Sequence, residues 1–77
     1  MNHQATDVII YTKNPLSDDQ FSEVARQVKT IDGVLRFERS QQKPNFIMVA
    51  YRAGQTRAII ILNKLTRLGF NASLVGI

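Results

Sequence analysis

The sequence predicts a small α+β fold in which a four-stranded antiparallel sheet carries two helices on one face. Three observations predict it. The chain has 77 residues, which suits one domain, and 44% of them are hydrophobic, which is enough for a globular core. Segments with the period of a strand and segments with the period of a helix follow one another in the order βαββαβ. We therefore expect a single domain over residues 1–77.

The first strand and the first helix are expected in the first 33 residues. Residues 7–13 are rich in β-branched and aromatic side chains and end at Asn14-Pro15, a combination that predicts a strand followed by a turn. From residue 17 onward the apolar residues recur every three to four positions, which predicts a helix. Ser17 and Gln20 form a capping-box pair at its start, and Gly33 is expected to close the helix in a left-handed conformation.

The second half of the chain predicts a hairpin, a helix and a last strand. Residues 34–39 and 46–51 are expected to form two strands joined by a short polar connection. A second helix is predicted over about residues 56–68, with Gly69 as its stop, and residues 70–75 close the sheet. The stripe of this helix that should face the core is Ala58, Ile61, Leu62, Leu65 and Leu68.

This order of elements predicts a ferredoxin-like sandwich, in which one face of the sheet carries no helix. We call this helix-free side the open face. Because side chains alternate along a strand, residues 8, 10 and 12 and residues 47, 49 and 51 are expected to face the helices. The outward side chains on the two central strands are then Ile9, Tyr11, Phe46, Met48 and Ala50. Since both sets of the third strand are apolar, a slip by one residue that reverses them remains an alternative.

The net charge of +4 is unevenly distributed along the chain. Residues 1–38 carry six acidic and four basic side chains, whereas residues 39–77 carry six basic side chains and no acidic one. Such a division can attract a phosphate backbone or an acidic protein, or can pair copies of the chain. Arg57, Lys64 and Arg67 line one face of the second helix, which we interpret as a solvated face, with an acidic partner as the alternative.

The composition excludes several classes of protein. The chain has no cysteine, so disulfide frameworks, thiolate metal sites and cysteine nucleophiles are excluded. The N-terminal residues lack a basic segment followed by an apolar stretch, and the longest apolar run covers only residues 58–62, far fewer than a membrane span needs. We therefore expect a cytoplasmic protein without a membrane segment.

A family resemblance covers nearly the whole chain. The pattern resembles the heavy-metal-associated domain of copper chaperones and metal-transporting ATPases in three stretches: Ser17 to Asp32-Gly33-Val34, Val49-x-Tyr51, and Ile61-x-x-x-Leu65-x-x-Leu68-Gly69-Phe70-x-Ala72. That family carries a Met-x-Cys-x-x-Cys loop at the start of its first helix. Counting back from Gly33 places the two thiol positions on Ser17 and Gln20 and the methionine position on Pro15. The resemblance therefore implies a fold that is kept and a thiolate site that is lost.

The donors at these two positions do not suit the family's metal. Copper(I) is held by soft thiolates, which a serine hydroxyl or a glutamine amide does not replace. We therefore expect no metal and no cofactor. A metal-binding chaperone with ligands other than cysteine is the alternative. His3, with its own and the preceding backbone nitrogens, has the ligand set for copper(II) or nickel(II) in a square plane.

Two functions compete for the open face. In the first, the face docks a protein partner or a second copy, with Ile9, Tyr11, Phe46 and Met48 as the contact surface and Arg36, Arg39 and Arg52 beside it. In the second, the face stacks the bases of single-stranded RNA, as the aromatic residues on the same strands of RNA-recognition motifs do. Phosphate contacts would then come from Arg36, Arg39, Lys43 and Arg52. Met48 stands where a second stacking aromatic would be expected, so we favour the first.

An enzyme is not expected. The single histidine is the third residue, and no nucleophile is paired with a base. The sequence therefore predicts a non-enzymatic binding or oligomerisation module, with a homodimer as the simplest form.

Overall fold

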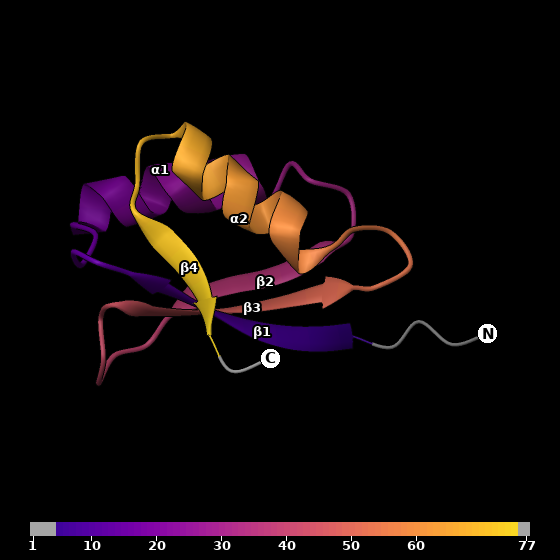
Figure 1. Cartoon of the computed structure of the whole chain (residues 1–77), viewed down its shortest axis with the longest axis horizontal. Helices are drawn as coiled ribbons and strands as arrows, with labels where there is room; N and C mark the ends of the chain where they lie inside the picture. Colours follow the sequence, from indigo (N-terminus) through magenta and orange to yellow (C-terminus); the bar gives the residue numbers. More distant parts are fainter. Residues whose placement is uncertain (1–4, 76–77) are drawn as a thin grey trace.

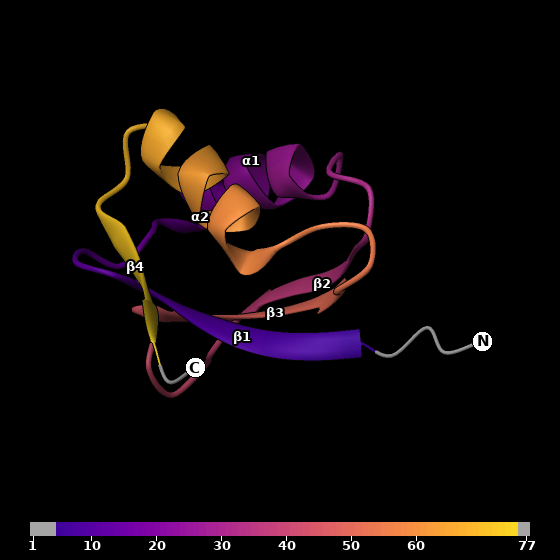
Figure 2. The same cartoon turned by 45° about the vertical axis from the view of Figure 1, so that its right-hand side comes forward.

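The computed structural model describes residues 5–75 and confirms the predicted architecture. Four antiparallel strands form one sheet in the order β2-β3-β1-β4, so that β3 and β1 are central. Both helices lie on the same side of this sheet, and the other side carries none (Figures 1 and 2). The elements are β1 (Ala5–Thr12), α1 (Asp18–Val28), β2 (Val34–Arg39), β3 (Phe46–Arg52), α2 (Ala58–Arg67) and β4 (Ala72–Val75).

The start of α1 is the predicted capping box. The backbone N–H of Gln20 donates to Oγ of Ser17 at 3.1 Å, and the backbone N–H of Ser17 donates to Oε1 of Gln20 at 2.9 Å. The expected closing role of Gly33 is wrong, because the helix ends at Val28 with Lys29 as its C-cap. Gly33 does have a φ of +100°, but it serves the turn that leads into β2.

Gly69 closes α2 as predicted. Its φ is +98°, its N–H donates to the carbonyl of Thr66, and the N–H of Phe70 donates to the carbonyl of Leu65. These two bonds form a Schellman motif, which needs a residue with positive φ at this position. The helix itself runs from Ala58 to Arg67 and is shorter than predicted. The turn after it is longer than predicted, residues 68–71, and β4 begins at Ala72 instead of residue 70.

The register of the central strands is the predicted one. Ile10, Ile47 and Val49 are almost fully buried beneath the helices, whereas Met48 and Tyr11 lie on the open face and are exposed. A slip by one residue is therefore excluded. The core also contains residues from both helices and from β2, among them Val24, Val28, Phe37, Ile61 and Leu65. Leu68, predicted to face the core, is 37% exposed, because it caps the helix beyond its last buried turn.

Candidate functional site: the open face of the sheet

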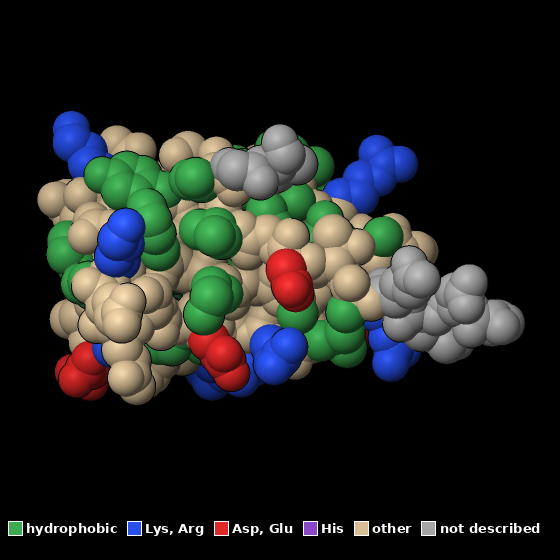
Figure 3. All heavy atoms as spheres, turned by 90° about the horizontal axis from the view of Figure 1, so that it is seen from below, with side chains coloured by type: hydrophobic (Ala, Val, Ile, Leu, Met, Phe, Trp, Pro, Cys, Tyr) green, Lys and Arg blue, Asp and Glu red, His purple; other side chains and the backbone are tan. Residues whose placement is uncertain are grey.

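The open face carries a group of large apolar side chains that nothing in the described chain covers. Met48 is 48% exposed, Tyr11 37% and Val75 36%, while Ile9 and Phe46 are partly exposed. They come from neighbouring positions of β3, β1 and β4, since Met48 pairs with Ile9, and Ile9 pairs with Val75. Seen from below, hydrophobic side chains gather over this face, with charges of both signs among them (Figure 3). A sheet face of this kind is usually polar when it meets only water.

Two aromatic side chains form one end of this surface. The rings of Tyr11 and Phe46 lie edge to face, with centroids 5.8 Å apart and planes at 70°. The ammonium group of Lys43 lies 5.5 Å from the centroid of the Phe46 ring. This cation–π contact places the ammonium group of Lys43 over the Phe46 ring. From the sequence, Lys43 was expected only to contact phosphates.

Ala50 lies on the open face but is not exposed, which corrects the sequence-based expectation. It is 4% exposed, because its two cross-strand neighbours, Asp7 on β1 and Arg36 on β2, have much longer side chains. The short methyl group forms the base of an open hollow of about 350 Å³ on this face. Met48, Glu38 and Ile9 line the same hollow on its other side.

Charges of both signs flank the apolar group. Arg36 and Glu38 lie on β2 beside Ala50 and Met48, and Asp7 lies on β1 on the other side of Ala50. Arg36 is on the open face as predicted, and Arg52 has the register position of that face at the end of β3. Sequence reasoning missed the two carboxylates. Strand alternation could have placed both on the open face, because side chains two residues apart on a strand point to the same side. Asp7 lies two residues before Ile9, and Glu38 lies two residues after Arg36.

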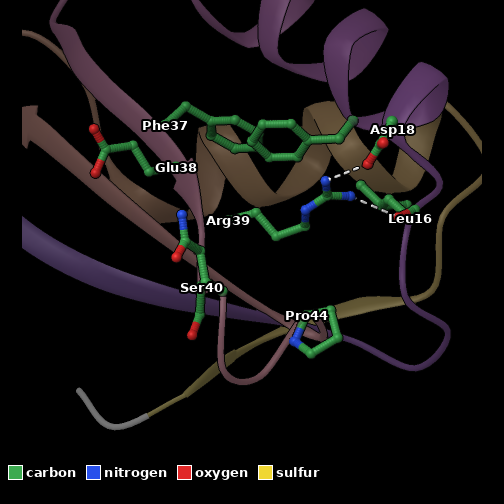
Figure 4. A pocket seen from close by; sticks show the side chains of 9 residues that line it. Leu16, Asp18, Phe37, Glu38, Arg39, Ser40 and Pro44 are labelled. Carbon is green, nitrogen blue, oxygen red and sulfur yellow. Dashed lines mark hydrogen bonds and ion pairs between the residues drawn. The ribbon is translucent and has the colours of Figure 1, made fainter.

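Arg39 is not on the open face, and this part of the sequence-based expectation is wrong. It has the same orientation as the buried Phe37, two residues earlier, so its side chain lies on the helix side of β2. Its guanidinium donates to the carbonyl of Leu16 at 2.8 Å and to Oδ1 of Asp18 at 2.6 Å (Figure 4). It also lies 4.9 Å from the centroid of the Phe21 ring. Arg39 therefore ties β2 to the start of α1.

The positions that would hold thiols are occupied by the helix cap. Both the Ser17 hydroxyl and the Gln20 amide oxygen accept backbone N–H groups at the start of α1. Neutral oxygen donors of this kind do not suit copper(I). In the part of the chain between residues 5 and 75, no three histidine, cysteine, aspartate or glutamate side chains gather in a group that could hold a metal ion. His3 and the two residues before it lie outside the described residues.

A second apolar surface lies on the outer side of α2. Ile59 is 48% exposed and Ile60 is 46% exposed, and Arg57, Lys64 and Arg67 stand on the same helix. No acidic residue occurs in this helix or after it. The charged residues of α2 itself are therefore all basic, whereas the strands of the open face carry both signs.

Three solved structures share the architecture of this chain. Oxidized MerP from Ralstonia metallidurans CH34 matches with a TM-score of 0.80 at 11% identity, over 95% of this chain and 100% of that one. The chain has the fold of a heavy-metal-associated domain. A copper binding domain from HMA7, a P-type ATPase, matches it with a TM-score of 0.78 at 13% identity, over 91% and 93% of the two chains. The CsoZ metallochaperone matches with a TM-score of 0.74 at 16% identity, over 95% and 100%.

The sequence itself gives no closer relationship. No protein-family model matches it, and no curated protein sequence matches it. The similarity to the three solved structures is therefore one of fold. Neither of the helices within residues 5–75 is long and apolar enough to cross a membrane.

Proposed function

We propose that this chain is a non-enzymatic binding module that uses the open face to dock a protein surface and no longer holds a thiolate-bound metal. The observation that carries the proposal is the exposure of Met48, Tyr11, Ile9 and Phe46 on the central strands. Exposed large apolar groups that adjoin one another mark interaction surfaces. Each of these residues is also partly buried, which keeps it in place, so that the surface exists before a partner arrives.

The size of the open face suits a reversible contact. Covering on the order of 600 Å² of apolar surface contributes about 15 kcal/mol at about 25 cal/mol per Å². The loss of translational and rotational freedom opposes this by about 4–15 kcal/mol. A partner that forms only a few further polar contacts would therefore bind in the range of a transient complex.

Binding of single-stranded RNA has less support from the same surface. The carboxylates of Asp7 and Glu38 border the apolar group, and they would repel a phosphate backbone. The guanidinium of Arg39, which was expected to contact phosphates, is held by Asp18 on the other side of the sheet. One end of the face keeps two aromatic rings, Tyr11 and Phe46, but they lie edge to face, and the centre of the face is the thioether of Met48.

The heavy-metal-associated fold supports the other two parts of the proposal, which are that the chain is a non-enzymatic module and that it holds no thiolate-bound metal. The solved structures that it resembles are described as a copper binding domain and a metallochaperone, and this chain lacks the cysteine that such thiolate sites need. Ser40 lines one hollow together with Asp18 and Glu38, but the partner of its hydroxyl is the backbone N–H of Lys43, which donates to Oγ at 3.1 Å, whereas catalysis needs a nucleophile and a base to be positioned together.

The proposal is tested with two matched variants. Met48→Asp and Ile59→Asp each place a carboxylate at a side chain that is 48% exposed, one on the open face and one on α2. Tagged wild-type chain and both variants are purified from the producing cell, and the proteins that accompany each are compared, together with the solution mass of each chain. A protein, either this chain or another, should accompany the wild type and Ile59→Asp and be lost with Met48→Asp. Equal recovery with all three chains, or loss only with Ile59→Asp, would contradict the proposal.

A further inference from the structure

We infer that the surface which docks onto the open face is the open face of a second copy of this chain. The inference rests on the proposed function, because it names the partner of the same surface. Two pairs of features carry it. On β3, the protruding side chain of Met48 lies beside the hollow at Ala50. On β2, next to them, lie the opposite charges of Arg36 and Glu38. A surface that carries complementary features side by side can pair with itself about a two-fold axis.

Two adjacent rows of side chains cross the open face at right angles to the strands. We call them the Ala50 row and the Met48 row. The cross-strand pairs show that the Ala50 row consists of Arg36, Ala50 and Asp7. In the same way the Met48 row consists of Glu38, Met48 and Ile9. The hollow of about 350 Å³ has Ala50 at its base and is lined by members of both rows, and the Met48 row contains the most exposed apolar side chain of the face.

The shapes of the two rows fit each other. Consider a two-fold axis that lies in the plane of the interface, at right angles to the strands, and passes midway between the two rows. This axis sets the Met48 row of each copy over the Ala50 row of the other. Each Met48 then enters the hollow above Ala50 of the second copy, and its flexible, unbranched thioether side chain can adapt to an irregular gap of this kind. The two sheets pack face to face, and their β3 strands run in opposite directions.

The charges fit in the same arrangement. The axis that seats Met48 over Ala50 also sets Arg36 of each copy opposite Glu38 of the other, because these residues are the β2 members of the two rows. Two equivalent Arg–Glu pairs therefore form at the edges of the contact. The same axis sets Asp7 of each copy opposite Ile9 of the other, because these are the β1 members of the two rows. β4 pairs with β1 only from Ile9 onward, so the side of Asp7 away from β3 stays open to water.

Two other arrangements fit less well. An axis along β3 would set Arg36 opposite Asp7 of the second copy, but it would also set Met48 against Met48 and leave both hollows unfilled. Contact through the outer side of α2 would bring together Arg57, Lys64 and Arg67 of both copies without any acidic residue of that helix to pair with them. Of these two surfaces of residues 5–75, the open face is the one whose own strands carry both signs of charge in a register that pairs with itself.

The experiment exploits the two Arg–Glu pairs. Arg36→Glu and Glu38→Arg each place like charges opposite each other at both pairs, so each variant should dissociate at least tenfold more readily than the wild type. An equimolar mixture of the two variants restores opposite charges at both pairs. It should therefore form a one-to-one dimer with an affinity within about threefold of the wild type. Arg67→Glu changes the net charge as Arg36→Glu does, but on α2, and should leave the dimer unchanged. Sedimentation equilibrium measures the mass, and circular dichroism checks that each variant is folded.

The possible outcomes separate the inference from the proposed function. A dimeric wild type, two monomeric variants and a dimeric mixture would support the inference. A wild type that stays monomeric at millimolar concentration would overturn it, while the comparison of Met48→Asp with Ile59→Asp would still decide whether another protein docks on the open face. A dimer that persists in Glu38→Arg, or a mixture that stays monomeric, would overturn the arrangement. A dimer that is lost in Arg67→Glu or Ile59→Asp, and kept in Met48→Asp, would overturn both the inference and the proposed function.

Discussion

Replacing Ser17 and Gln20 with cysteine should give the chain a copper(I) site that the wild type lacks. These residues occupy the two thiol positions that the family resemblance assigns. The structure places them at the N-cap and at the third position of α1, where each side chain already reaches the other residue's backbone N–H at 3.1 Å or 2.9 Å. Two sulfurs at these positions start close together. The positive end of the helix dipole also favours their thiolate forms.

The expected effect on stability changes sign with the metal. Without metal, Ser17→Cys/Gln20→Cys loses both hydrogen bonds of the capping box, which should cost about 1 kcal/mol. For a domain of this size such a loss lowers the melting temperature by about 4–8 °C. With copper(I) at about 1,000 times its dissociation constant, binding to the folded chain should add about 4 kcal/mol and more than reverse the loss.

Copper(I) is supplied under anaerobic, reducing conditions, and the metal that stays with the protein through gel filtration is measured per chain. Ser17→Ala/Gln20→Ala serves as the control that loses the cap without gaining thiols. The double cysteine variant should retain about one copper(I), and the wild type and the control none. Copper(I) retained by the wild type would refute the loss of metal binding. A folded cysteine variant that retains no copper would refute the assignment of the two positions.

Three further predictions concern the turn before β2, α1 and the open face. Gly33→Ala should lower the free energy of unfolding by about 1–3 kcal/mol, because φ is +100° and a Cβ would lie 2.8 Å from Cβ of Gln55. Gly69→Ala has the same positive φ without a contact within 4 Å, so a chemical-denaturation experiment that finds equal losses would contradict the clash. The side-chain amide of Gln27 holds the pKa of Glu23 below its usual value. The stability that Glu23 contributes should therefore be present above its unfolded pKa and be lost as the pH falls through its folded pKa. An NMR carboxyl titration at or above the usual value would contradict this. Single-stranded RNA should leave the amide signals of β1 and β3 unchanged at low salt, and shifts that vanish with added salt would instead favour RNA binding.

The fold could be predicted because local and long-range signals agree. The bounds of β2 match the prediction, and the capping box at Ser17 and the closing motif at Gly69 form with the residues that the sequence indicated. The register of β3 was open from the sequence alone, since both of its sides are apolar. Pairing with β1 resolves it, because Thr12 and Val8 must share the buried side with Val49.

The composition of the open face was only partly predictable. Its apolar members follow from alternation along β1 and β3. The placement of Arg39 on the open face was wrong because its charge alone was taken to indicate exposure. Phe37 lies two residues earlier and is buried, so alternation places Arg39 on the helix side of β2, where it donates to the carbonyl of Leu16. The hollow over Ala50 depends on the lengths of neighbouring side chains from two other strands, which no single segment of sequence reveals.

A dilution series followed by amide chemical shifts tests most directly whether the open face is the docking surface of this chain. As the concentration falls from the millimolar to the micromolar range, signals of β1 and β3 around Ile9, Tyr11, Phe46 and Met48 should move together along one binding curve, while those of α2 stay in place. Concentration-dependent shifts that centre on Ile59 and Ile60, with an unchanged sheet, would contradict the account.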